Sequence, residues 1–176
     1  MAGTFGGSVP VSHICLALRA TVIAIGIALA CLQPRATAEQ LPSEHPNVAE
    51  IVRLINQERA KAGLPGFNVN DRLAAAATFH INWMRQHRCY EHRCLDEPDL
   101  DTRVLETGYD TGSAGENLDI ELRTPQAVVA DWLASPIHYA NIFERGFEDV
   151  GCAYLEGAGG PWWTCVFGRE IGMASE

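Results

Sequence analysis

Three side chains of this 176-residue chain stand out as candidates for chemistry, because each lies beside a turn and outside any regular apolar pattern. His92 lies between two cysteines, Glu116 lies near the start of a predicted strand, and His138 follows a serine–proline break. Imidazoles and carboxylates are ligands that Zn²⁺ favours when they converge from separate segments. The alternative is a hydrogen-bonded network in which Glu116 orients a histidine. The sequence therefore predicts either a weak zinc site or such a network.

Regularly spaced apolar residues predict the elements that must position these side chains. The predicted helices cover 46–62, 70–87, 101–106, 124–134 and 137–143. The predicted strands lie within 112–120, 147–155 and 162–168. Asn70 is a typical N-cap, and Thr124-Pro125 is a strong helix start. Helices packed on a small, largely antiparallel sheet make an α+β sandwich the expected fold.

The first 38 residues read as a signal peptide. An apolar stretch over 20–32 follows Arg19 and is shorter than a membrane-spanning helix needs. Ala36-Thr37-Ala38 is a small-residue cleavage site, which places the cut between Ala38 and Glu39. An uncleaved anchor over 14–32 and a lipoprotein attached through Cys31 are the weaker alternatives. The sequence therefore predicts a secreted or periplasmic protein with no membrane contact after cleavage.

Cleavage would remove two of the six cysteines and leave four, an even number that favours two disulfides in an exported domain. A hairpin around the glycine-rich turn 157–161 sets Cys152 opposite Cys165, at a separation that a disulfide can span. Cys89 then pairs with Cys94 across a short loop. A zinc knuckle built from the Cys89–Cys94 segment is less favoured, because export oxidises its thiols.

Composition bounds the possible partners. The chain has 13 Lys and Arg against 22 Asp and Glu, a formal net charge of −9, and the predicted signal peptide carries two basic residues and no acidic ones. Nucleic acid is therefore excluded as a partner, since its phosphates demand positive charge. No G-x-S-x-G elbow, H-E-x-x-H helix, P-loop or Rossmann glycine motif is present. The predicted domains are a signal peptide (1–38), a polar leader (39–47), one globular domain (48–168) and a C-terminal tail (169–176).

Four stretches in order resemble the CAP superfamily, whose domain is also called SCP or PR-1-like, in its compact bacterial secreted form. They are INQERAKAGL at 55–64, CYEH at 89–92, AGENLD at 114–119 and ADWLASPIHYANIF at 130–143, and WWTCVFG at 162–168 resembles the closing strand. The resemblance implies a three-layer α-β-α sandwich with a cleft lined by histidines and acidic residues. The cleft histidines of the family match His92 and His138, and its cleft glutamate matches Glu116.

The chain departs from the family pattern at one position of that cleft. A second cleft glutamate, three residues after the tryptophan in plant and animal members, falls here on Ser135. Its loss removes a metal ligand or general base and makes catalysis less favoured. Tyr139 is a further candidate for the cleft through its hydroxyl, although packing is an equal alternative.

Three functions follow from the resemblance. The favoured one is a secreted CAP protein whose cleft binds a metal, a small ligand or an extracellular partner, such as a peptide or an envelope component. The second is a metal-dependent envelope hydrolase acting on peptide or cell-wall material. The third is a carrier of an apolar ligand such as a lipid or sterol. Zinc is the one cofactor that the residues suggest, and no catalytic residue is assigned.

Overall fold

The computed structural model describes residues 42–171, so the predicted signal peptide and the Ala38/Glu39 cleavage point lie outside the described residues. A short 3₁₀ helix, five α-helices and four strands make up this part of the chain. The helices are η1 (Pro42–Glu44), α1 (Pro46–Lys61), α2 (Asp71–His87), α3 (Leu100–Glu106), α4 (Pro125–Ala134) and α5 (Pro136–Phe143). The strands are β1 (Asn68–Val69), β2 (Thr111–Ile120), β3 (Asp149–Leu155) and β4 (Trp162–Glu170).

The four strands form one sheet in the order β1-β3-β4-β2. β4 lies in the centre and pairs antiparallel with both β2 and β3, which confirms the largely antiparallel sheet predicted from the sequence. β1 pairs in parallel with β3 and was not predicted, because two residues are too few for an alternating pattern. β2 is an edge strand, and the site residue Glu116 lies on it.

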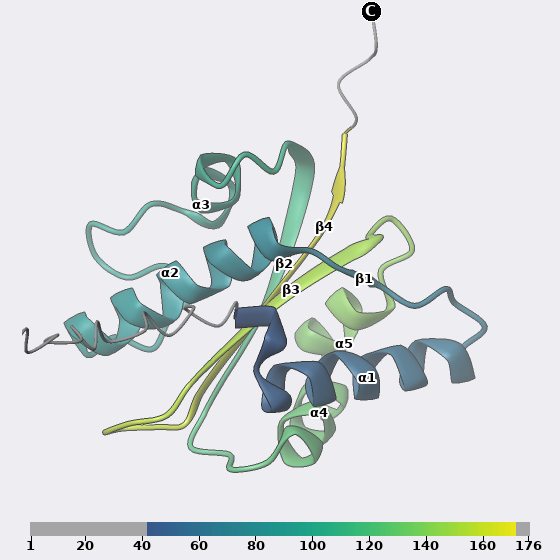
Figure 1. Cartoon of the computed structure of the whole chain (residues 1–176), viewed down its shortest axis with the longest axis horizontal. Coiled ribbons are helices and arrows are strands. Elements are labelled where there is room, and N and C mark those ends of the chain that lie inside the picture. Colours follow the sequence, from purple (N-terminus) through teal and green to yellow (C-terminus); the bar gives the residue numbers. More distant parts are fainter. Residues whose placement is uncertain (1–41, 172–176) are drawn as a thin grey trace, which may run out of the picture. The chain divides into compact units, whose positions relative to one another are not determined.

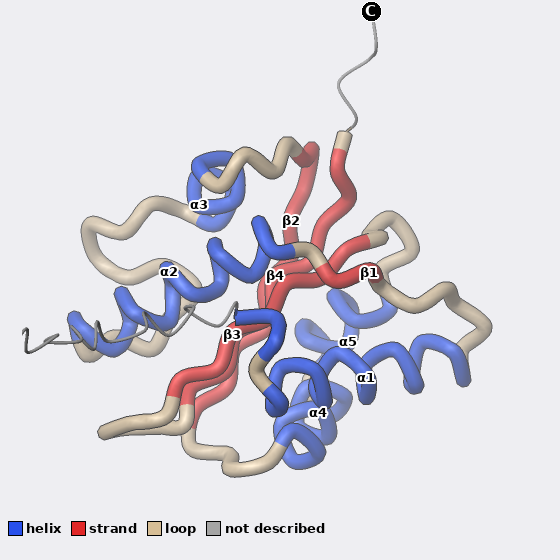
Figure 2. Tube along the Cα trace, in the orientation of Figure 1, coloured by secondary structure: helices blue, strands red, loops and turns tan. Residues whose placement is uncertain are grey.

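Helices cover both faces of the sheet (Figures 1 and 2). α2 and α3 lie on one face, and α1, α4 and α5 lie on the other. Each face has its own apolar cluster, one built around Trp132 and Trp163 and the other around Leu73 and Met84. α2 lies directly on β3, since a methyl group at Gly151 would be 2.0 Å from the backbone nitrogen of Ala74. The predicted three-layer α-β-α sandwich is confirmed.

Both predicted disulfides are present. Cys152 and Cys165 face each other across β3 and β4 with their Cα atoms 4.0 Å apart. Cys89 and Cys94 close a short loop after α2, with Cα atoms 6.0 Å apart. Because that loop carries His92, the second disulfide restrains a site residue directly.

The ends of the domain differ from the predicted boundaries. Residues 42–47, which were predicted as a polar leader, form η1 and the first residues of α1, where the His45 ring accepts a hydrogen bond from the Asn47 amide. β4 continues two residues past the predicted domain end at 168. Glu170 pairs there with Thr111 of β2, and its side chain forms an exposed ion pair with Arg72 of α2 at 2.6 Å. Across 42–171, no helix combines the length and apolar character needed to cross a membrane.

Candidate functional site

The three candidate residues lie together beside β2. His92 Nδ1 donates to Glu116 Oε1 at 2.9 Å, and the centroids of the His92 and His138 rings are 6.5 Å apart. Glu116 comes from β2, His92 from the disulfide loop and His138 from the first turn of α5. The side chain of His92 is 54% exposed, whereas that of Glu116 is buried. These three residues are called the histidine site below.

A buried charge network lies behind the histidine site. Arg103 donates through Nη2 to Glu116 at 2.6 Å and through Nη1 to Glu97 at 2.9 Å. His80 Nδ1 lies 2.6 Å from the same oxygen of Glu97, and its Nε2 lies 3.6 Å from Glu116. The side chains of these four residues are almost completely buried. Glu116 is thus held between an arginine inside the protein and a histidine at its surface.

Two members of this network were not identified from the sequence. Arg103 lies on α3, a helix of seven residues that is too short to show which face is buried. Glu97 lies in the loop that leads to α3 and accepts the backbone N–H of Cys94 at 3.0 Å. The sequence did place His80 on the inner face of its helix. Because a buried imidazole needs a hydrogen-bond partner, His80 was the one indication that a polar partner such as Glu97 lies nearby.

The stretch Gly115-Glu116-Asn117 positions α5 as well as the carboxylate. Asn117 Nδ2 donates to the carbonyl of His138 at 3.1 Å, and its Oδ1 accepts from Asn141 at 2.8 Å. Asn141 also donates to the carbonyl of Glu116 at 3.1 Å. A methyl group at Gly115 would be 2.6 Å from Asn141 Oδ1, so only glycine allows this approach. Three adjacent residues of β2 therefore determine where His138 lies.

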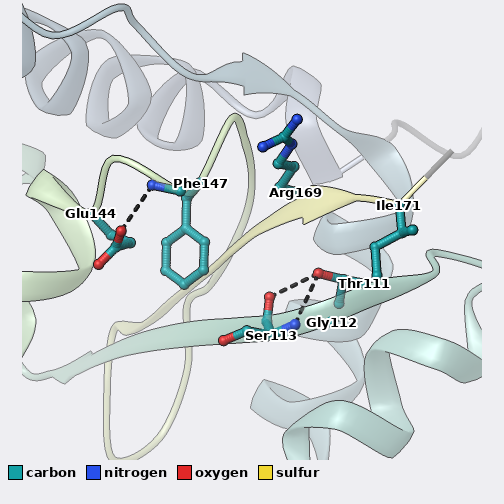
Figure 3. Close-up of a pocket in the computed structure, with 8 residues that line it drawn as sticks. Thr111, Gly112, Ser113, Glu144, Phe147, Arg169 and Ile171 are labelled. Carbon is teal, nitrogen blue, oxygen red and sulfur yellow. Dashed lines mark hydrogen bonds between the residues drawn. The ribbon is translucent and has the colours of Figure 1, made fainter.

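Side chains bind several backbone groups of the edge strand β2. Trp132 donates through its indole N–H to the carbonyl of Leu118 at 2.9 Å, and Asn141 donates to the carbonyl of Glu116 at 3.1 Å. Near the start of the strand, Thr111 Oγ1 donates to the Ser113 carbonyl and accepts from the Ser113 amide (Figure 3). Side chains that satisfy the edge groups blunt a strand edge against pairing with another chain. A cavity of about 350 Å³ lies beside this end of β2, and its lining also includes Phe147, Arg169 and Ile171 (Figure 3).

Burial is the main cause of the pKa shifts of the groups described next. Burial lowers the pKa of His138, and the nearby His92 lowers it further. Burial also raises the pKa of Asp119, with a further contribution from Asp131, to about 7. The pKa of Tyr90 rises to about 12 through burial and the same two carboxylates. Asp119 and Asp131 were not among the predicted site residues, although AGENLD ends on Asp119.

Asp119→Asn is expected to raise stability above neutral pH. Because the pKa of folded Asp119 lies above its ordinary value, the wild type loses stability as the pH rises from about 4 through about 7. The amide cannot ionise, so the variant should be more stable at pH 8 by roughly 1–3 kcal/mol, less than the full shift implies because solvent screens a carboxyl near the surface. Denaturant unfolding at a series of pH values measures this. Asp110→Asn, at an exposed position before β2, is the control, and parallel pH profiles for wild type and Asp119→Asn would contradict the expectation.

The two accessory residues lie on α5 and at its start. Ser135 connects α4 to α5 and donates its amide to the carbonyl of Asp131 at 3.1 Å. Tyr139 is 47% exposed, and its ring stacks on Phe143 with centroids 4.2 Å apart. This stacking favours the packing alternative for the Tyr139 ring.

The histidine site does not fit a three-ligand zinc centre. Both oxygens of Glu116 already accept hydrogen bonds, and the Arg103 guanidinium places a fixed positive charge 2.6 Å from one of them. Within residues 42–171, no three or more His, Cys, Asp or Glu side chains are arranged to hold a metal ion. The two imidazoles of His92 and His138 are the groups left to contact a metal.

This domain belongs to the CAP family. The family model described as the cysteine-rich secretory protein family matches residues 52–167, which cover all the residues of the histidine site and both disulfides. The chain is 29% identical over 118 residues to YkwD of Bacillus subtilis, an uncharacterized protein. This match covers 67% of the present chain and 45% of YkwD, so the chain spans less than half of that relative.

Solved structures show the same fold. The domain superposes on an extracellular SCP-domain protein of Bacillus anthracis with a TM-score of 0.66 at 23% identity, covering 70% of this chain and 40% of the other. An outer surface protein of Borrelia burgdorferi matches with a TM-score of 0.65 at 20% identity, covering 70% and 92%. A cysteine-rich secretory protein of Staphylococcus aureus matches at 0.62 and 15%, covering 76% and 40%.

Proposed function

We propose that this CAP-domain protein is exported and that its histidine site binds a ligand without catalysing a reaction. The ligand would be a small molecule, a metal ion or an extended segment of an envelope partner. The observation that carries the proposal is the double engagement of Glu116, whose two oxygens accept from Arg103 and His92. A general base must be free to take a proton from a substrate or a water. Glu116 has no such freedom while its partners remain in place.

Two further observations support this reading. Ser135 stands where relatives in plants and animals carry a second glutamate, so the obvious alternative base is missing. His92 is half exposed and His138 is partly buried, so an imidazole pair is accessible from outside. Such a pair can donate to or accept from a ligand and can stack against it.

Export is supported by the two disulfides, which persist in oxidising compartments. The similarity to an extracellular protein of Bacillus anthracis points the same way. Both agree with the signal peptide predicted over residues 1–38.

The purified protein is expected to cleave neither a peptide library nor peptidoglycan. Mass spectrometry of the products, with and without a chelator, measures this. Glu91→Gln, an exposed carboxylate in the same disulfide loop, is the matched control for Glu116→Gln. Turnover that survives in Glu91→Gln and disappears in Glu116→Gln would overturn the proposal.

A second candidate function, the envelope hydrolase, draws on Asp119. A buried carboxyl with a pKa of about 7 can exchange protons at neutral pH, as a general acid or base must. Asp119 and His138 both interact with Asp131, which relates the carboxyl to the histidine site. Turnover in the same assay that is abolished by Asp119→Asn and kept by Glu116→Gln would favour this hydrolase.

Zinc binding at the histidine site is expected to be weak and to depend on both imidazoles, since structural zinc sites use four protein ligands and catalytic sites three. Isothermal titration with Zn²⁺ should give small heats that disappear in His92→Ala and in His138→Ala. His87→Ala, an exposed histidine at the end of α2, serves as the control. Equal heats in all four proteins would show that zinc does not bind at this site.

A further inference from the structure

A second cavity lies away from the histidine site, between the end of α2, the disulfide loop and the turn that joins β3 to β4. Its volume is about 690 Å³, within the range of small-molecule sites in proteins. Its apolar wall includes Trp162, Tyr90 and Ile120. Its polar wall includes Arg85 and Arg88. Neither His92 nor His138 lines this cavity.

The apolar wall is aromatic and suits a flat ring. Trp162 is only 6% exposed, and Tyr90 meets it edge-on with ring centroids 6.4 Å apart. The indole N–H of Trp162 is buried and has no hydrogen-bond partner within residues 42–171. Buried indole N–H groups ordinarily find an acceptor. The cavity therefore offers an aromatic surface, and one of the rings that line it carries a buried, unsatisfied N–H.

The polar wall is positive. Arg85 lies on the last turn of α2, and Arg88 is the residue that ends this helix. Both side chains are exposed, and neither forms an ion pair or side-chain hydrogen bond with any residue of 42–171. Arg88 adopts a left-handed conformation, with φ of 53°, at a position where glycine or asparagine is usual. Two unpaired guanidinium groups beside one cavity in an acidic chain favour an anionic ligand, because guanidinium matches carboxylate geometry.

We propose that this cavity is a second ligand site, which takes a small planar aromatic carboxylate. The ring would pack against Trp162 and Tyr90, and the carboxylate would lie against Arg85 and Arg88. This inference is independent of the proposed function, because no residue of the histidine site takes part. The disulfide loop connects the two regions, since Cys89 lines the cavity and His92 lies three residues further on.

The test uses naphthoate as the probe and the neutral naphthalene-methanol as its uncharged counterpart. The readout is the indole N–H resonance of Trp162 in ¹⁵N-labelled protein, assigned with the variant Trp162→Phe. Naphthoate is expected to shift this resonance with a dissociation constant of about 1 mM or lower, the affinity expected for a ligand of this size. The alcohol is expected to bind about tenfold more weakly, since it lacks the charge.

The double variant Arg85→Gln/Arg88→Gln is expected to weaken naphthoate binding about tenfold as well. Arg145→Gln, an exposed arginine after α5, is the matched control and should bind like the wild type. The proposal is overturned by no shift of Trp162 up to about 5 mM probe. It is equally overturned by equal binding of acid and alcohol, or by unchanged binding in the double variant. Shifts confined to His92 and His138 would place the probe at the histidine site and also overturn it.

Discussion

Replacing Arg103 by methionine is expected to lower the free energy of unfolding by about 3–5 kcal/mol. The guanidinium lies between two buried carboxylates, with Nη2 2.6 Å from Glu116 and Nη1 2.9 Å from Glu97. Without it, both carboxylates would remain buried with one positive charge removed from between them. A buried charge that loses its ionic partner is strongly destabilising, because the hydrogen bonds that remain to Glu97 and Glu116 do not replace the lost positive charge.

Denaturant unfolding measures this loss, and an exposed arginine provides the scale. Arg53→Gln removes an ion pair with Glu50 on the surface of α1, and the loss is expected to be small because solvent screens both groups. The loss of stability in Arg103→Lys should lie between those of Arg103→Met and Arg53→Gln. A single ammonium keeps the charge but cannot contact both Glu97 and Glu116 as the guanidinium does. Equal losses for Arg103→Met and Arg53→Gln would contradict a stabilising role for the network.

The same variant should also disturb the histidine site. Arg103 donates to the backbone carbonyl of His92 at 3.3 Å and holds the carboxylate that accepts from the His92 ring. The ring C–H resonances of His92 should therefore shift in Arg103→Met and stay unchanged in Arg53→Gln. Because Arg103→Lys keeps the charge, it shows whether position or charge is what His92 senses.

Local signals predicted most of the fold. The Asn70 side chain accepts hydrogen bonds from the amides of Arg72 and Leu73, and the Thr124 hydroxyl accepts from the Ala127 amide, as expected for N-caps. The facing positions of Cys152 and Cys165 followed from two strands around one turn. Each of these features depends on residues near one another in the chain, so one sequence is enough to reveal it.

Interactions between distant segments could not be predicted in the same way. The Arg103 network joins α2, the loop before α3, α3 and β2, and no spacing in the chain relates these segments. Asn141 was hidden for the same reason, because its partners Asn117 and Glu116 lie more than twenty residues earlier. The resemblance to relatives pointed to the three residues of the histidine site, but it did not indicate what holds them.

Removal of the Cys152–Cys165 disulfide is the second large effect. The double variant Cys152→Ala/Cys165→Ala is expected to lower the free energy of unfolding by about 3 kcal/mol. The disulfide closes a loop between cysteines 13 residues apart and so restricts the unfolded chain. Both cysteines are buried, Cys152 on β3 and Cys165 on β4. The ladder between these strands and the packing of Trp163 remain in the variant, so the histidine site should keep its geometry.

Cys89→Ala/Cys94→Ala is the natural counterpart, because it removes the other disulfide. Its cysteines are only five residues apart, so the same reasoning gives a smaller loss of about 2 kcal/mol. This loop, however, carries His92 and presents the Cys94 amide to Glu97. The two double variants should therefore separate stability from site geometry. The unfolding midpoint should fall further in Cys152→Ala/Cys165→Ala, whereas the His92 resonances should shift in Cys89→Ala/Cys94→Ala. A shift of His92 in the first variant as large as in the second would show that the β3–β4 disulfide also holds the histidine site.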